Sequence, residues 1–223
     1  MNKNKIFIAC DTKNIQTVKK IIKQTQNSEL NIGYKFGLEF LNSKRGREFV
    51  SKLKNKITFG DYKLADIPNT CASTIKAVKD LKFNYITIHI NSGYEALKAA
   101  KVVAGKTRLV GVSVLTSLND KSLKEIGYNK KVEKIVLQQA KLAKKAKLDA
   151  IVCSPMEVSL VRKVFKKEII TPGIRFGYKK DDQKRTLTPK QAYRNGSNWL
   201  VIGRPITKGN IKNNIKNLIN LLK

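Results

Sequence analysis

Residues 57–70 read ITFGDYKLADIPNT, an apolar run that passes into a cluster of charged side chains. Asp61 and Lys63 stand two positions apart, so on an extended backbone they point to the same side. Asp66 comes just before Pro68, where the chain must turn and can begin a helix. The stretch therefore predicts a strand, a turn and a helix start. Its charges at the strand end are poor core material, because buried charges must be paired.

The same alternation of short apolar runs and amphipathic runs extends in both directions, as in parallel βα units. We expect strands at 5–10, 32–38, 57–63, 85–91, 108–115, 149–153, 168–173 and 199–203. We expect helices at 15–26, 44–54, 69–81, 94–104, 132–147, 156–166, 189–195 and 210–222. This count in 223 residues predicts the α/β class and a compact (β/α)8 TIM barrel, with residues 1–223 as a single domain. A doubly wound open sheet is the alternative, but no G-x-G-x-x-G follows the first strand.

The charge balance is extreme, with 46 basic and 16 acidic residues and a net charge of +30. Such a balance is typical of proteins that bind nucleic acids or anionic membranes. The lysines, however, are spread over most of the chain and form no single basic arm. We therefore favour coding bias and attraction of an anionic ligand, and we expect no specific nucleic-acid partner. No apolar run is long enough to span a membrane, so we expect no membrane partner.

The three cysteines, Cys10, Cys71 and Cys153, form neither a zinc-spaced set nor a disulfide framework, so we expect a reducing cytoplasm. The single histidine, His89, follows an apolar run and is more typical of a structural residue than of a catalytic one. No Ser/His/Asp or Cys/His set and no metal-ligand spacing stands out. The sequence therefore predicts no metal site.

In a barrel of this kind, the chemistry lies at the carboxyl ends of the strands. Each predicted strand has a polar residue at or just after that end. These residues are Asp11, Lys35, Asp61, Lys63, His89, Asn91, Thr116, Ser154, Arg175 and Arg204. We expect them to share one rim.

Four charged residues form a first candidate group: Lys35, Asp61, Lys63 and Asp66. Opposite charges within about 4–6 Å hold one another ionised. A lysine kept protonated between carboxylates is a poised proton donor. This group therefore suits a site that manages a proton and a negative charge.

A second candidate group follows the last two strands. The loops after strands seven and eight commonly bind phosphate in this fold, through backbone N–H groups near a glycine and a charged side chain. Gly203 and Arg204 fit this pattern. Arg175 opens the irregular stretch 174–188 and Gln183 lies within it, so this stretch could fold down over a phosphate.

Several motifs together resemble the orotidine 5′-phosphate decarboxylase family in its shorter bacterial form. The most specific is D-x-K-x-x-D-I-P-N-T at 61–70, and T-P-G-I-R at 171–175 and G-R-P-I-T at 203–207 follow at the right distance. Further matching stretches are 9–11, 33–39, 114–117, 152–155 and 182–185. The resemblance runs nearly from end to end.

This resemblance implies a homodimeric (β/α)8 barrel that converts orotidine 5′-monophosphate (OMP) to UMP and CO2. That reaction is the last step of de novo pyrimidine biosynthesis, and the family uses no metal and no organic cofactor. Lys63 is then the proton donor to the pyrimidine carbon that loses CO2, and Asp61 lies against the departing carboxylate. Lys35 and Asp66 complete the charge network.

The resemblance also implies the substrate contacts. Asp11 and Lys35 resemble contacts to the ribose hydroxyls, and Thr116 resembles a contact on the base side. The phosphate would be held by Arg175, Gln183, Gly203 and Arg204. Asp66, Ile67 and Thr70 would reach in from the partner subunit.

Two departures from the family pattern stand out. Ala65 occupies a position where bacterial members usually carry histidine, and His89 is followed by Ile-Asn-Ser-Gly instead of Ala-Ser-Gly-Gly. The nearest alternative is a sugar-phosphate lyase that shares D-x-K-x-x-D but uses Mg²⁺, such as 3-keto-gulonate-phosphate decarboxylase or hexulose-phosphate synthase. Lys35 and the stretch 67–70 favour the nucleotide enzyme. A basic nucleic-acid-binding protein is the second alternative, although no basic arm or aromatic platform supports it.

Overall fold

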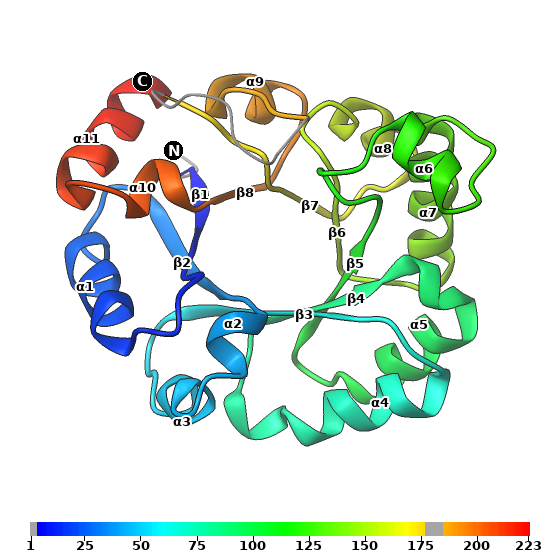
Figure 1. The fold of residues 1–223 in the computed structure, drawn as a ribbon, viewed down its shortest axis with the longest axis horizontal. Coiled ribbons are helices and arrows are strands. Elements are labelled where there is room, and N and C mark those ends of the chain that lie inside the picture. Colours follow the sequence, from blue (N-terminus) through cyan, green and yellow to red (C-terminus); the bar gives the residue numbers. More distant parts are fainter. Residues whose placement is uncertain (1–3, 177–184) are drawn as a thin grey trace.

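The computed structural model describes residues 4–176 and 185–223, and in this part of the chain eight parallel strands close into a barrel (Figure 1). Each strand pairs with the next one in sequence, and β8 pairs with β1 to complete the ring. The strands are β1 (Lys5–Ala9), β2 (Asn31–Phe36), β3 (Ile57–Leu64), β4 (Tyr85–His89), β5 (Arg108–Val112), β6 (Ala150–Val152), β7 (Glu168–Thr171) and β8 (Trp199–Ile202). The predicted TIM barrel is therefore confirmed.

The helices surround the ring of strands (Figure 1). They are α1 (Ile15–Thr25), α2 (Leu38–Leu41), α3 (Gly46–Ser51), α4 (Pro68–Ala77), α5 (Gly93–Val103), α6 (Asp120–Glu125), α7 (Val132–Lys145), α8 (Val158–Val164), α9 (Pro189–Arg194), α10 (Arg204–Thr207) and α11 (Ile211–Leu222). The 3₁₀ turns are η1 (Lys79–Leu81) and η2 (Ile90–Ser92). None of the described helices is long and apolar enough to cross a membrane.

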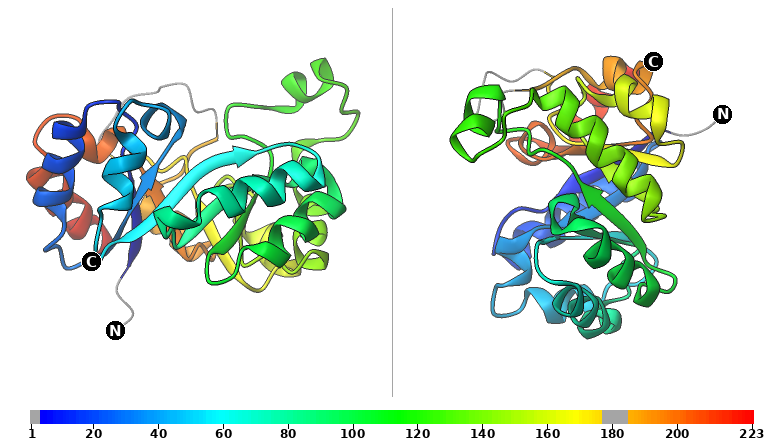
Figure 2. Two further views of the ribbon diagram at one scale, coloured as in Figure 1. Left: turned by 90° about the horizontal axis from the view of Figure 1, so that it is seen from below. Right: turned by 90° about the vertical axis from the view of Figure 1, so that its right-hand side faces the viewer.

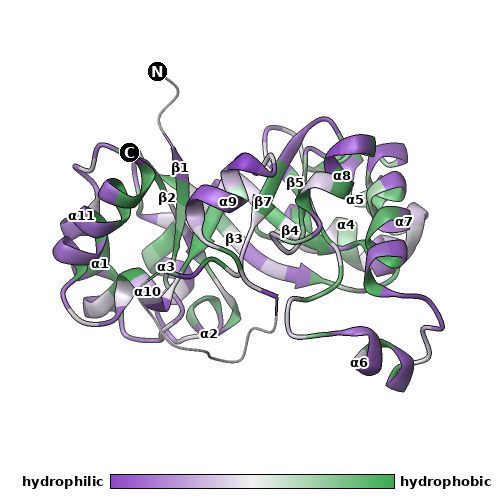
Figure 3. Cartoon of the chain, turned by 90° about the horizontal axis from the view of Figure 1, so that it is seen from above, coloured by the Kyte–Doolittle hydropathy of each residue, from purple (hydrophilic) through white to green (hydrophobic). Residues whose placement is uncertain are grey.

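All eight predicted helices are present, but the sequence interpretation missed three short ones: α2, α6 and α10. Helix α6 buries only Leu123, so it has no apolar face that periodicity could detect. A local signal did exist, because the side chain of Asn119 accepts a hydrogen bond from Ser122 N as an N-cap. Helix α6 stands away from the body of the barrel (Figures 2 and 3).

Several predicted strands extend past the last residue of the observed strand, and 108–115 does so by the most. The run 85–91 leaves the sheet after His89, and 108–115 leaves it after Val112. Ile90 and Val114 are nevertheless buried in the loops that follow. Buried apolar residues therefore continue past the last residues that pair in the sheet. Sequence periodicity detects burial and could not distinguish the end of the strand from the buried residues that follow it.

The barrel interior is filled at one level by a plug of apolar side chains. Phe7 stacks on Trp199 with ring centroids 4.1 Å apart, and Phe59 and Tyr85 pack around Phe7. Val110, Ala150 and Ile170 complete this cluster. A larger apolar layer lies between the strands and the helices, whose outer faces are hydrophilic (Figure 3). The plug leaves the carboxyl ends of the strands as the part of the lumen that can hold a ligand.

Candidate active site

A cavity of about 520 Å³ opens above the plug, at the carboxyl ends of the strands. Its floor follows from strand geometry, because side chains two residues apart point to the same face. Six of the seven plug residues are followed two positions later by a residue of the cavity wall. These six are Ala9, Asp61, Val112, Val152, Pro172 and Val201. The sheet register thus sets a charged group, Asp61, into an otherwise apolar floor.

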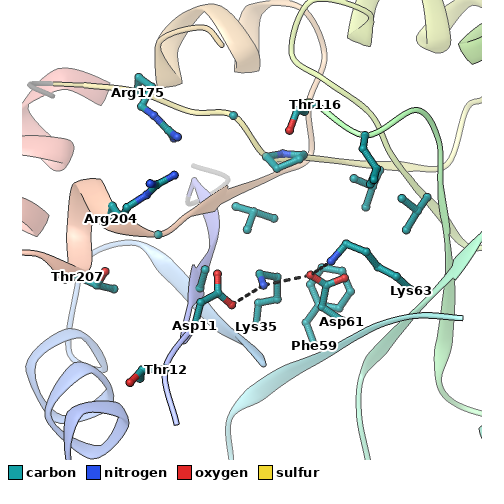
Figure 4. Close-up of a pocket in the computed structure, with 18 of the residues that line it drawn as sticks. Asp11, Thr12, Lys35, Phe59, Asp61, Lys63, Thr116, Arg175, Arg204 and Thr207 are labelled. Atoms are coloured by element: carbon teal, nitrogen blue, oxygen red, sulfur yellow. Dashed lines mark hydrogen bonds and ion pairs between the residues drawn. The ribbon is translucent and has the colours of Figure 1, made fainter. Parts of the chain in front are cut away.

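Four charged side chains from three strand ends meet beside this floor (Figure 4). Lys35 Nζ lies 2.9 Å from Oδ1 of Asp11 and 3.1 Å from Oδ2 of Asp61. Lys63 Nζ lies 2.7 Å from the same Oδ2 of Asp61. The structure therefore brings together four residues that the sequence placed in the site, in the order Asp11, Lys35, Asp61 and Lys63.

The surroundings of Asp61 and Lys35 hold both groups ionised. Burial alone would raise the pKa of Asp61, but the charges of Lys35 and Lys63 outweigh it and lower the pKa to about 2. Burial would lower the pKa of Lys35, but Asp61 and Asp11 outweigh it and raise the pKa above its ordinary value. Asp61 and Lys35 are therefore fixed charges at neutral pH.

Two backbone features make room for this network. Lys63 has φ +49°, in the left-handed region that is uncommon outside glycine. Gly37 follows β2, and a Cβ there would stand 2.9 Å from Oδ1 of Asp11 and 3.4 Å from Nζ of Lys35. A larger residue at position 37 would therefore displace the Asp11 carboxylate and disturb its ion pair with Lys35.

The residues predicted to bind phosphate lie on the walls formed by the last two strand ends. Arg175 follows β7, whereas Gly203 and Arg204 follow β8, and all three line the cavity. Figure 4 shows the two arginine side chains near one another, with Lys63 on the β3 side. Thr116, after β5, also lines the cavity. Gln183, which was predicted to join the phosphate group, lies outside the described residues.

Three further predicted residues are exposed at the rim and do not line the described cavity of their own chain. Ile67 is 65% exposed, and Asp66 and Thr70 are exposed as well. Oδ1 of Asp66 accepts a hydrogen bond from the Ile67 backbone N at 2.7 Å. Their predicted place in a partner subunit's site stays a prediction.

His89 and Asn91 have separate surroundings. His89 is half-buried at the end of β4, where burial and then the charge of Lys63 lower its pKa. Oδ1 of Asn91 accepts a hydrogen bond from Nε2 of Gln139 on α7 at 2.6 Å. Asn91 therefore links the turn after β4 to a helix, and it is absent from the described cavity wall.

Sequence reasoning missed a buried ion pair beside the site. Nη1 of Arg185 lies 2.5 Å from Oε1 of Glu157, and Nη2 donates to the carbonyl oxygens of Val114 and Leu115. The pair therefore ties the chain after β7 to the loops after β5 and β6. The sequence could not predict this ion pair because Arg185 and Glu157 lie 28 positions apart. Thr12 and Thr207 also line the cavity without having been predicted to do so.

The part of the chain that the structure describes contains no group of three or more His, Cys, Asp or Glu side chains arranged to hold a metal ion. The polar groups of the cavity are instead lysine, arginine, carboxylate and hydroxyl groups. A closed parallel barrel with such a cavity at its strand ends defines the class of (β/α)8-barrel enzymes.

Comparison with known proteins identifies the family within this class. Residues 4–214 match the model of the orotidine 5′-phosphate decarboxylase / HUMPS family. The chain belongs to this family, and the resemblance read from its motifs is confirmed.

Individual relatives agree with this assignment. An orotidine 5′-phosphate decarboxylase of Wolbachia sp. subsp. Brugia malayi (strain TRS) is 43% identical over 223 residues, which is 97% of each chain. The crystal structure of orotidine 5′-phosphate decarboxylase from Lactobacillus acidophilus superposes with a TM-score of 0.83 at 30% identity, covering 99% of this chain and 100% of the other. An orotidine 5′-monophosphate decarboxylase from Methanocaldococcus jannaschii, complexed with the inhibitor BMP, shares the fold at a TM-score of 0.80 and 23% identity over 99% of both chains.

Proposed function

We propose that this enzyme decarboxylates OMP to UMP and CO2, the last step of de novo pyrimidine biosynthesis. One observation carries the proposal: two lysine ammonium groups share Oδ2 of Asp61 on the floor of a cavity whose far wall carries Arg175 and Arg204. A nucleotide has the matching chemistry, with an anionic phosphate at one end and a ring that must accept a proton at the other.

The charge network supplies every protein group that the proposed step needs. The bond between the ring carbon and the carboxylate breaks, its electron pair stays on the ring carbon, and neutral CO2 leaves. Lys63 stabilises the developing negative charge and then gives one proton to that carbon, forming a C–H bond. Water later returns a proton to the neutral amine. Fixed positive charge aimed at the site of developing negative charge is an efficient form of catalysis, because the protein need not reorganise.

We assign the supporting roles as follows. Asp61 lies against the departing carboxylate, and Asp11 and Lys35 bind the ribose hydroxyls. Thr116 contacts the base side. Arg175, Gln183, Gly203 and Arg204 bind the phosphate, whose binding energy holds the ring against the network. These assignments are supported by the shared cavity of all but Gln183.

We further propose that the active form is a homodimer in which Asp66, Ile67 and Thr70 enter the partner's site. An exposed Ile67 beside the cavity mouth supports this, because a large apolar side chain gains by being covered. We place the enzyme in the cytoplasm as one catalytic domain over residues 1–223. The three free, buried thiols Cys10, Cys71 and Cys153 support a reducing compartment.

The family description also covers HUMPS, so family membership alone does not choose between activities. The relatives at 43% and 30% identity, both named as the decarboxylase, favour OMP. The deciding experiment follows the absorbance change of OMP with purified protein in excess EDTA. Full turnover supports the proposal. The lyase alternative would be supported if the protein does not turn over OMP but does turn over a sugar phosphate, and if that activity is lost in EDTA and restored by Mg²⁺.

A further inference from the structure

Thr87 on β4 is fully buried and is absent from the described cavity wall, yet it belongs to the same layer of the barrel as Asp61. Thr87 stands two residues after the plug residue Tyr85, just as Asp61 stands two residues after Phe59, and Phe59 pairs with Tyr85 in the sheet. The side chain of Thr87 therefore points into the lumen, beside the charge network.

The pairing of β3 with β4 is irregular at this point. Gly60 pairs with Ile86, and the next pair is Leu64 with Ile88. Three residues of β3, at positions 61–63, therefore stand opposite one residue of β4, which is Thr87. Such a bulge bends a strand and re-aims its side chains, and it leaves backbone groups without their usual partners. The left-handed backbone of Lys63 closes this bulge.

The Thr87 hydroxyl takes the place of the missing strand pairing. The Lys63 backbone N donates to Oγ1 of Thr87 at 2.7 Å, and Oγ1 lies 3.1 Å from Oδ1 of Asp61. An N–H group can only donate, so the oxygen accepts from Lys63 and its own proton goes to the carboxylate. The Thr87 hydroxyl thus accepts a hydrogen bond from Lys63 and donates one to Asp61, and the side chains of these two residues form the ion pair at 2.7 Å.

We propose that Thr87 is a positioning residue for the Lys35–Asp61–Lys63 network. Its hydroxyl holds the bulge of β3 in the one shape that points Asp61 and Lys63 into the cavity together. A threonine with a purely structural role need not contact the network at all: the hydroxyl of Thr107 donates to the carbonyl oxygen of Phe83, and that of Thr58 to Asn84. The kinetic consequence of this inference rests on the proposed function, whereas its structural consequence does not.

The test compares Thr87→Val, which keeps the shape and loses the hydroxyl, with Thr87→Ser, which keeps the hydroxyl. The matched control is Thr58→Val, because Thr58 is also a buried threonine at the β3–β4 boundary, but its hydroxyl meets Asn84 instead of a member of the network. Two quantities are measured: kcat and KM with OMP, and the hydrogen-exchange rate of the Lys63 backbone amide.

Thr87→Val should lower kcat by about 100-fold with little change in KM, because small displacements of reacting groups cost about this much. Its Lys63 amide should exchange at least about tenfold faster, because the hydrogen bond that protects it is gone. Thr87→Ser should stay within a few-fold of the wild type in both quantities, and Thr58→Val should change neither. If Thr87→Val does not fold, Thr87→Ala carries the same test.

Unchanged kcat and unchanged Lys63 exchange in the folded Thr87→Val or Thr87→Ala protein would overturn the inference. So would an equal loss of kcat in Thr58→Val, because a general loss of stability would then explain both. If the wild type does not turn over OMP, the proposed function fails, and the exchange measurement still decides whether Thr87 holds Lys63.

Discussion

The ammonium nitrogen of Lys63 lies 2.7 Å from Oδ2 of Asp61, two residues earlier on the same strand. Lys35 binds the same oxygen at 3.1 Å, but the two lysines differ in access. The side chain of Lys35 is 10% exposed, whereas that of Lys63 is 36% exposed. Lys63 is therefore the more accessible of the two lysines, whereas the more buried Lys35 bridges Asp11 and Asp61 at the cavity wall.

Replacing Lys63 by alanine should abolish decarboxylation. We expect kcat to fall by about 10³-fold or more, because the variant loses both the charge at the reacting carbon and the proton donor. Binding of UMP should remain measurable by calorimetry, because Arg175 and Arg204 are intact. The matched control is Lys82→Ala, since Lys82 is also a left-handed lysine, with φ +50°, but lies exposed away from the cavity. Near-normal turnover of Lys63→Ala would refute the donor role.

Mixing two inactive proteins should restore activity if the site is shared between subunits. A hybrid of Lys63→Ala and Asp66→Ala subunits has one site with both residues intact. With random exchange of equal amounts, half of the dimers are hybrids, so about a quarter of the wild-type activity per subunit is expected. Subunit exchange is verified with differently tagged chains. No recovery in a mixture that contains hybrids would count against a site completed by Asp66 of the partner.

Arg204→Ala should weaken the binding of UMP by about 10- to 100-fold, since a charge-assisted hydrogen bond is worth roughly 1.5–3 kcal/mol. Binding of uridine, which lacks the phosphate, should be unchanged, and Arg204→Lys should lose less than the alanine variant. Arg194→Ala, an exposed arginine on α9, serves as the control for the loss of one positive charge. An equal loss for UMP and uridine would show that Arg204 does not act on the phosphate.

The charge network should make stability depend on pH in acid. The pKa of Asp61 is lowered from 3.8 to about 2 in the folded protein, so its contribution is complete above pH about 4 and is lost as the pH falls toward 2. We expect the difference in unfolding free energy between the wild type and Asp61→Asn to shrink by roughly 2 kcal/mol over this interval. Denaturant titrations at several pH values measure it. A difference that stays constant from pH 5 to pH 2 would contradict the assignment.

Much of the fold could be predicted from the sequence because its signals are local. Alternating apolar and amphipathic runs predicted all eight strands. Helix α6 was not predicted because it is short and buries only one residue, so its sequence shows no amphipathic pattern. The site was predicted in outline for a different reason: D-x-K at 61–63 is a contiguous motif. The structure places Lys35, Asp61 and Lys63 of the predicted charge group in contact and adds Asp11, whereas Asp66 of that group lies exposed.

What the sequence by itself determined was the order of elements and the charged motif at the end of β3, because periodicity and turn chemistry act over a few residues. Only the tertiary structure decided that Lys35 binds Asp61 across two strands, that Thr87 lies opposite a bulge, and that Arg185 pairs with Glu157. The reason is physical: closure of the barrel and the register between neighbouring strands set these contacts, and both depend on residues far apart in the chain.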